Sequence, residues 1–205
     1  MCRVLSFFVT VMLSRSSTDT AFLPDSDVGA PEPPRLQRPL GLTVMLFLGA
    51  FALLQWGWNE ARGTWIEQLV IDQMTVKTAV ALINAVDPAI EVQAVGSRLK
   101  ATGGGINILN GCEGIEVVFL LASAMLVAPI AWRARLLGLG VGSIVVFLLN
   151  QGRVIALFYA FRGNRALFDT LHGVIAPLLL ILAAGAFFIA WLSWHGSRRR
   201  VNPEQ

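Results

Sequence analysis

Three residues whose side chains can do chemistry stand far apart in this sequence: Cys112, Arg153 and His172. A cysteine becomes a good nucleophile when nearby cations or the start of a helix stabilise its thiolate. Histidine can give and take a proton near neutral pH. The permanently charged guanidinium of arginine can hold a thiolate or the oxyanion of a tetrahedral intermediate. Brought together, these residue types predict a Cys-His-Arg acyl-transfer site.

The composition indicates a membrane protein. Of the 205 residues, 55% are hydrophobic and 14% are charged, whereas a soluble domain carries roughly 25% charged residues. A helix needs about 20 apolar residues to cross a bilayer, and four stretches meet or approach that length. These predicted spans are residues 39–58, 115–132, 136–161 and 171–194, the third interrupted by a polar run from Asn150 to Arg153. We therefore expect an all-α polytopic membrane protein with about four transmembrane helices.

The segments outside the membrane domain differ in composition from it. Residues 1–38 hold an apolar run too short to span and a proline-rich linker. They are interpreted as a disordered cytoplasmic tail or an over-extended start, with a cleaved signal peptide as the alternative. The membrane domain is expected to cover residues 39–195, and residues 196–205 to form a basic cytoplasmic tail.

The long loop between the first two predicted spans, residues 59–111, is expected to form a small cap on the outer face. Apolar residues recur at helical spacing over residues 65–86, which predicts a helix at the membrane interface. Residues 90–111 alternate like a strand pair, with glycines for turns. Such a β-hairpin either binds an extended substrate by strand addition or is an ordinary surface hairpin.

Clusters of arginine orient the predicted spans, because short loops rich in Lys and Arg stay on the cytoplasmic side. The clusters are Arg35 and Arg38 before the first span, Arg133 and Arg135 after the second, and Arg198, Arg199 and Arg200 after the fourth. An even number of spans puts all three clusters inside, although Arg162 and Arg165 fall on the other face. Cys112, Arg153 and His172, from three different segments, then all approach the outer face.

Each of the three residues also has a plain structural explanation. A lone cysteine is often a small buried hydrophobe, and a histidine at a helix start often lies in the headgroup layer. Arg153 could pair with Glu116, because an arginine inside a membrane needs a partner. A non-catalytic membrane subunit or small-solute carrier, with Arg153–Glu116 as a structural ion pair, is therefore the alternative from another class. An intramembrane protease that releases its product to water is an enzymatic alternative.

Several other functions are disfavoured by the same residues. A disulfide is not expected, because Cys2 is predicted inside and Cys112 outside. A metal site lacks ligands, since the second histidine, His195, lies at the inner end, and no cofactor is expected. The chain shows no basic-aromatic pattern typical of nucleic-acid binding, so its net charge of +3 is interpreted as a topology signal.

The ordered motifs resemble those of the exosortase/archaeosortase family. They are "GCEGIE" (111–116), "NQGR" (150–153) and the histidine at position 172, and the resemblance covers about residues 40–195. It is closest to the short exosortases paired with IPTL-type C-terminal sorting signals. The resemblance implies an integral-membrane cysteine transpeptidase in the cytoplasmic (inner) membrane, with its active site on the outer, periplasmic face.

Roles and partners follow from this resemblance. By position, Cys112 would be the nucleophile, Arg153 the charge-stabilising arginine and His172 the general acid/base. The residues in supporting roles would be Glu116, Asn150 and Glu113. The implied partners are exported proteins ending in a short motif, a transmembrane helix and a basic tail, together with a membrane lipid or envelope acceptor.

Overall fold

The computed structural model of the protein describes residues 39–108 and 111–201, with the backbone alone from residue 196. The predictions for the N-terminal segment, including Cys2, Arg35 and Arg38, lie outside the described residues, as do residues 202–205. The elements, in chain order, are α2 (Leu40–Glu60), α3 (Trp65–Gln68), η1 (Leu69–Val76), α4 (Lys77–Val86), η2 (Pro88–Ile90), β1 (Gln93–Val95), β2 (Arg98–Ala101), β3 (Gly104–Asn107), α5 (Ile115–Val127), α6 (Trp132–Gly163), α7 (Arg165–Thr170), η3 (Leu171–Ile175) and α8 (Ala176–Val201).

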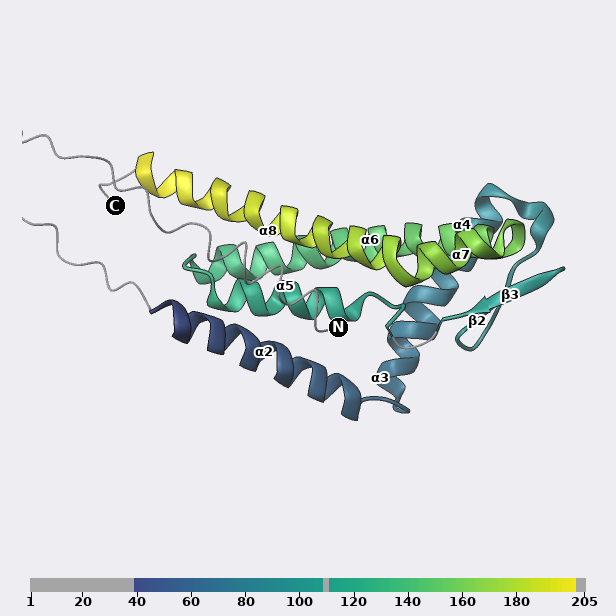
Figure 1. The fold of residues 1–205 in the computed structure, drawn as a ribbon, viewed down its shortest axis with the longest axis horizontal. Coiled ribbons are helices and arrows are strands. Elements are labelled where there is room, and N and C mark those ends of the chain that lie inside the picture. Colours follow the sequence, from purple (N-terminus) through teal and green to yellow (C-terminus); the bar gives the residue numbers. More distant parts are fainter. Residues whose placement is uncertain (1–38, 109–110, 202–205) are drawn as a thin grey trace, which may run out of the picture. The chain divides into compact units, whose positions relative to one another are not determined.

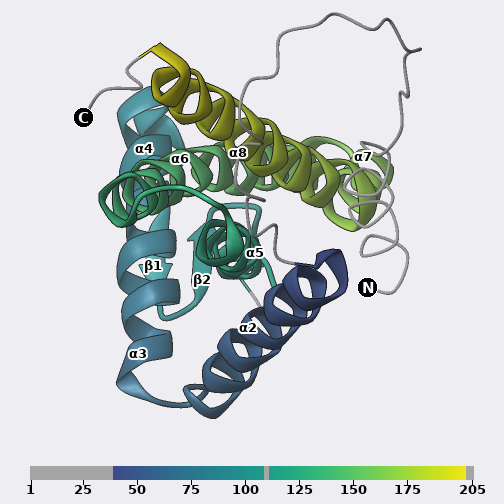
Figure 2. The same cartoon turned by 90° about the vertical axis from the view of Figure 1, so that its left-hand side faces the viewer.

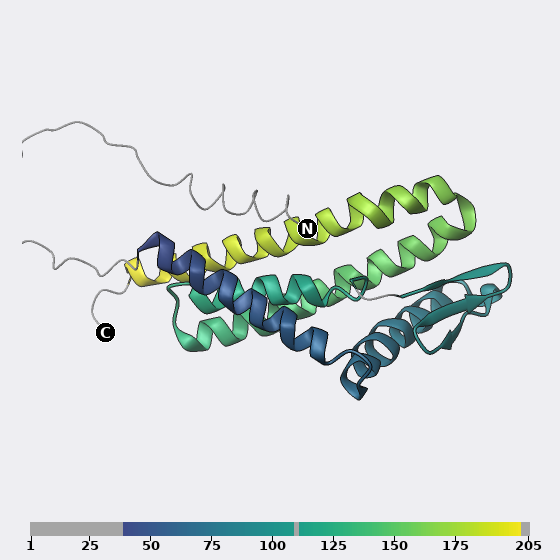
Figure 3. The same cartoon turned by 60° about the horizontal axis from the view of Figure 1, so that its bottom comes forward.

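Four helices form a bundle. α2, α5, α6 and α8 lie side by side, with α5 in contact with each of the other three and α6 packed on α8 (Figures 1 and 3). Successive bundle helices run in opposite directions, so that α2 and α6 end where α5 and α8 begin (Figure 1). Their outward faces carry large exposed apolar side chains such as Leu53, Ile144 and Leu179. An apolar outer surface on an antiparallel bundle is what a bilayer requires.

Two glycines let α6 approach its neighbours closely. A Cβ at Gly138 would lie 2.5 Å from Nε1 of Trp191, and one at Gly142 would lie 2.4 Å from Cδ2 of Leu121. The indole of Trp191 also donates a hydrogen bond of 3.0 Å to the carbonyl of Ala134. Small residues at such spacing are typical of packed membrane helices, where close backbone approach replaces the hydrophobic effect.

Four helical stretches are long and apolar enough to cross a membrane, but they are not quite the four that the sequence predicted. They are Leu40–Glu60, Trp65–Val86, Trp132–Gly163 and Arg165–His195. The predicted span 115–132 is corrected to the 13-residue helix α5, which is about 20 Å long against a hydrocarbon core of about 30 Å.

A proline explains why α5 is short. Ala128 precedes Pro129 and has an extended backbone, because a proline ring clashes with a helical conformation of the residue before it. Arg135 then donates hydrogen bonds to the carbonyls of Ala128 (2.9 Å) and Ile130 (3.5 Å) and so satisfies acceptors freed at the end of the helix. The chain turns directly into α6.

The interrupted third span and the start of the fourth also need correction. The polar run at residues 150–153 does not break α6, which is one continuous helix of 32 residues. The fourth helical stretch begins at Arg165, where Asn164 caps α7 by accepting a hydrogen bond of 3.1 Å from the backbone of Leu167. His172 therefore lies within a helix instead of opening it.

The loop 59–111 forms a cap of one helix and one small sheet. Residues 65–86 make a continuous helix, begun by Thr64 and Glu67: the Thr64 hydroxyl accepts from the backbone of Ile66, and the Glu67 carboxylate accepts from the backbone of Gly63 at 2.6 Å. This helix runs across the direction of the bundle (Figure 2). The predicted hairpin is instead a three-stranded antiparallel sheet in the order β1-β2-β3, because both Gly96 and Gly103 adopt the positive φ that tight turns need.

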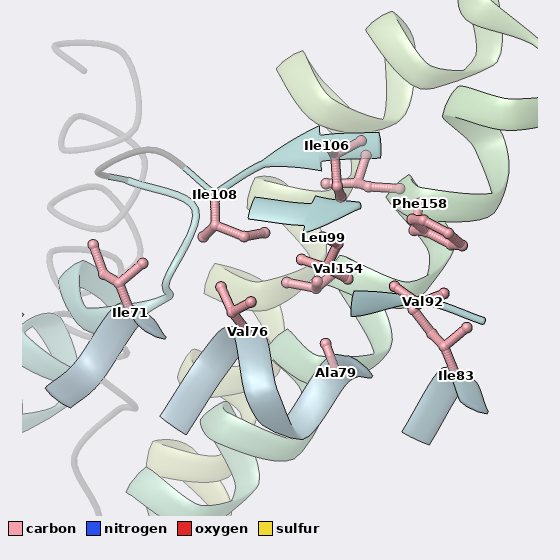
Figure 4. Close-up of a cluster of buried hydrophobic side chains, with 11 residues drawn as sticks. Ile71, Val76, Ala79, Ile83, Val92, Leu99, Ile106, Ile108, Val154 and Phe158 are labelled. Atoms are coloured by element: carbon pink, nitrogen blue, oxygen red, sulfur yellow. The ribbon is translucent and has the colours of Figure 1, made fainter. Parts of the chain in front are cut away.

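A buried apolar cluster joins this cap to the end of the bundle. Leu99 and Ile106, paired across β2 and β3, pack with Val76 and Ile83 of the helix and with Phe158 of α6 (Figure 4). Leu99, Val76 and Phe158 are fully buried. The cluster, which also includes Ile108 just after β3, therefore fixes the sheet against the same end of α6 that carries Arg153.

This arrangement predicts that the cap and the α5–α6 turn lie on opposite sides of the membrane. In a chain with Cys2→Ala and Cys112→Ala, the substitution Ala94→Cys in β1 should react with an impermeant maleimide in intact cells whose periplasm is accessible. Ala131→Cys, exposed just before α6, should react only after the membrane is permeabilised. Labelling of Ala131→Cys from outside would contradict this topology.

Candidate active site

Cys112 lies in a turn just before α5 in which two glycines adopt backbone conformations that other residues rarely take. Gly111 and Gly114, on either side of it, have φ values of 93° and 79°, a region that strains residues with a Cβ. A Cβ at Gly114 would also lie 2.9 Å from Cγ of Asn150, so the loop sits directly against α6. The loop thereby holds the cysteine just ahead of the first residue of α5, Ile115.

Arg153 reaches this cysteine from α6. Its side chain is buried, with 9% of its surface exposed, and its Nη2 donates a hydrogen bond of 3.9 Å to Sγ of Cys112. A guanidinium stays charged throughout the accessible pH range. Its contact with sulfur therefore favours the thiolate, which is the nucleophilic form.

His172 approaches the same sulfur from η3, in the helical stretch that follows α6. Its Nδ1 lies 3.9 Å from Sγ of Cys112. The imidazole stacks on the ring of Phe168, with centroids 5.5 Å apart and planes at 5°, and Phe168 in turn meets Phe161 edge-on at 5.4 Å. The ring plane of His172 is thus set by an aromatic stack built on the cap side of the bundle.

Two helical segments at this end depart from α-helical geometry. η1 and η3 are π-helical, and η3 carries His172. In η1 the hydroxyl of Thr75 donates 2.9 Å to the carbonyl of Val70, five residues earlier. Single π turns inside helices occur frequently at functional sites. The apolar periodicity of a sequence does not distinguish such a turn from an α-helical one.

Glu113 follows Cys112 directly, and Asn150 lies one turn before Arg153 on α6. Both side chains are buried, and both hold the loop that carries the cysteine. The side-chain amide of Asn150 donates 2.9 Å to the backbone carbonyl of Glu113. The Glu113 carboxylate accepts from the backbone N–H of Gly111 at 2.6 Å and from the indole N–H of Trp58 at 3.2 Å. Trp58 was not singled out in the sequence, because a tryptophan at the end of an apolar run is typical of any membrane helix.

Glu116, the alternative partner of Arg153, is placed differently. It is half-buried in the first turn of α5. Between these two described residues the structure records no ion pair, and the guanidinium of Arg153 is directed to sulfur instead.

Several polar atoms around the motif "NQGR" are buried without a hydrogen-bond partner in the described part of the chain. They are Oδ1 of Asn150, Nε of Arg153 and both amide atoms of Gln151. Buried polar atoms are normally satisfied, because an unmade hydrogen bond in the interior costs free energy. Their concentration on one turn of α6 favours a functional role for this turn over simple packing.

An apolar pocket of about 310 Å³ adjoins the loop. It lies between η1, α5 and α6 and is bounded by Glu113 and Gly114 at one end and by Met74, Val118 and Phe147 along its walls. Among the described residues, no group of three or more His, Cys, Asp or Glu could hold a metal ion. The side chains that meet at this place are a thiol, an imidazole and a guanidinium, beside an apolar pocket.

No family model, no curated protein and no solved structure matches this chain.

Proposed function

We propose that this protein is a membrane-embedded cysteine transpeptidase, as its resemblance to the exosortase/archaeosortase family implies. One observation carries the proposal: Sγ of Cys112 lies 3.9 Å from both Nη2 of Arg153 and Nδ1 of His172. The three side chains come from three separate elements: the turn before α5, helix α6 and the π-helical segment η3. The chain acts in the cytoplasmic membrane, at its outer face.

The reaction follows from the roles of the three groups. The Cys112 thiolate attacks the carbonyl carbon of the scissile peptide bond, and the resulting oxyanion is stabilised by the Arg153 guanidinium. Protonated His172 gives its proton to the leaving amine, the C–N bond breaks, and the carbonyl group remains as a thioester on Cys112. His172, now neutral, takes a proton from the nucleophile of the acceptor. That nucleophile displaces the thiolate, which leaves the new ester or amide and the original enzyme.

The substrates in this proposal are exported proteins whose C-terminus carries a short motif, a transmembrane helix and a basic tail. The cut would separate the protein from its membrane helix. A membrane lipid or envelope component would then accept it. The apolar surface of the bundle supports this proposal, because it lets a membrane-anchored tail reach the site without leaving the bilayer.

Removing the nucleophile should abolish processing. Cys112→Ala replaces one small side chain with another, so we expect normal membrane insertion but no cleavage of a co-expressed reporter with an IPTL-type C-terminal signal, measured by immunoblot. Cys112→Ser should be nearly inactive, because a hydroxyl is a much weaker nucleophile than a thiolate. Cys2→Ala is the matched control and should process normally. Normal processing by Cys112→Ala would instead favour a carrier or a non-catalytic subunit.

Removing the general acid/base should be almost as damaging. We expect His172→Ala to lose roughly 10²–10⁴-fold in processing rate, and His172→Gln to give no recovery, because glutamine cannot exchange a proton. His195→Gln is the control: this histidine lies near the far end of α8, where its Nδ1 is 3.0 Å from the carbonyl of Trp191. A loss of less than about tenfold in His172→Ala would assign the residue to packing on Phe168.

Arg153 should require the geometry of a guanidinium. A lysine keeps the charge without the planar fork, so Arg153→Lys should insert stably and lose roughly 10²–10³-fold in rate. Arg162→Lys, in the exposed last turn of the same helix, should keep its activity.

The same residue also separates the enzyme from its structural alternative. If Arg153 served only as counter-ion to Glu116, then Glu116→Ala should rescue Arg153→Ala in the double variant. We expect no rescue, since the guanidinium contacts sulfur. Recovery of processing in the double variant would reduce Arg153 to a structural role.

A further inference from the structure

The loop that carries Cys112 is fastened to α2 through a single carboxylate. One oxygen of Glu113, Oε1, accepts a hydrogen bond of 3.2 Å from Nε1 of Trp58, and the other, Oε2, accepts one of 2.6 Å from the backbone of Gly111. Gly111 and Glu113 are the immediate neighbours of Cys112. The carboxylate therefore links the two neighbours of the cysteine to each other and also links the loop to α2.

The burial of both partners shows that this contact is a built feature of the fold. Glu113 is 6% exposed and Trp58 is 7% exposed. Trp58 is also the one buried residue of α2, a helix that is described over its full length. Its ring meets Phe119 of α5 edge-on, with centroids 6.4 Å apart. A carboxylate is an acceptor-only group with room for both donors, and no neutral side chain of the same shape can replace it.

We infer that Trp58 and Glu113 form a latch that positions Sγ of Cys112 between Arg153 and His172. In this role Glu113 is a positioning residue, since its carboxylate acts through the backbone of the loop. The inference rests on the proposed function for its biological meaning, but the latch itself can be measured without any substrate.

Loss of the latch and loss of the negative charge predict opposite changes in the reactivity of Cys112. A carboxylate near a thiol disfavours the thiolate by repulsion, so removing its charge alone would make Cys112 more reactive. Loss of the latch lets Sγ drift from Arg153 and His172, which makes it less reactive at neutral pH. The amide of Glu113→Gln has one acceptor and one donor, so its NH₂ must face the N–H of either Trp58 or Gly111.

The test measures the rate at which iodoacetamide alkylates Cys112 at neutral pH. It uses the full chain in lipid nanodiscs, with Cys2→Ala so that one cysteine remains. We expect Glu113→Gln to slow alkylation by up to roughly a hundredfold, the effect of a displacement of about 1 Å in an active site. Trp58→Phe, which keeps the ring and removes the N–H that binds Oε1 of Glu113, should slow alkylation as well. Adding it to Glu113→Gln should slow the reaction little further, because both substitutions break the same contact. Glu60→Gln, an exposed carboxylate two residues after Trp58 in α2, is the matched control and should alkylate normally.

Each outcome decides the question. Alkylation of Glu113→Gln at the original rate or faster would overturn the latch, as would an unchanged rate in Trp58→Phe. Should Glu113→Gln not accumulate in the membrane, Trp58→Phe alone decides: slowed alkylation of that variant supports the latch, and an unchanged rate overturns it.

The latch and the proposed function also fail separately. Slowed alkylation in Glu113→Gln together with normal processing by Cys112→Ala would leave the latch standing and remove the transpeptidase proposal. Loss of processing in Cys112→Ala with unchanged alkylation in Glu113→Gln would do the reverse.

Discussion

The buried guanidinium of Arg153, in the C-terminal third of the apolar helix α6, is the constraint around which the cap and the cysteine loop are arranged. Arg153 is nine-tenths buried, and an arginine in a membrane costs at least about 2.5–3.5 kcal/mol near the bilayer centre unless it finds a partner or an edge. The described contact of its Nη2 is with the sulfur of Cys112. Carboxylates are the usual partners of buried arginines, so a sulfur in that place is unusual and supports the role proposed for Cys112.

The remaining elements can be understood as the means of bringing a loop to that guanidinium. Asn150, one turn earlier on α6, holds the backbone of Glu113, and Gly114 leaves no side chain between loop and helix. The sheet packs on Phe158 through Leu99 and Ile106, which anchors the chain just before the loop. Energetically, the apolar cluster stabilises the cap, and the cap limits where the loop can go.

Part of this arrangement could be predicted from the sequence, and the limits have physical causes. Apolar length predicted α2, α6 and α8, and the arginine clusters predicted that Cys112, Arg153 and His172 approach one end of the bundle, where the structure brings them into contact. The length of α5 was wrong because hydropathy counts residues and ignores the backbone restriction that Pro129 imposes. The third strand was missed because the alternation of apolar and polar residues indicates strands but does not indicate how many turns divide them.

The contacts that fasten the site could not be predicted, because they join residues far apart in the chain through hydrogen bonds. Trp58 and Glu113 are 55 positions apart, and neither residue type signals a pairing. Such a pairing is a property of tertiary structure, and one sequence carries no statistical trace of it. The stacking of His172 on Phe168 is local, but it was missed because the predicted helix began at residue 171 and left Phe168 outside it.

The π turn at His172 has a consequence for how this site tolerates changes in length. A π turn accommodates an extra residue within a helix, and each residue of an ordinary α-helix advances the side chains by about 100° around the axis. Deleting one residue between Arg165 and Leu171 would therefore let the helix relax to α geometry while swinging the imidazole away from the sulfur. Insertions and deletions in α7 or η3 would then rotate His172 relative to the sulfur of Cys112, so the length of this segment is constrained together with the side chains that it positions.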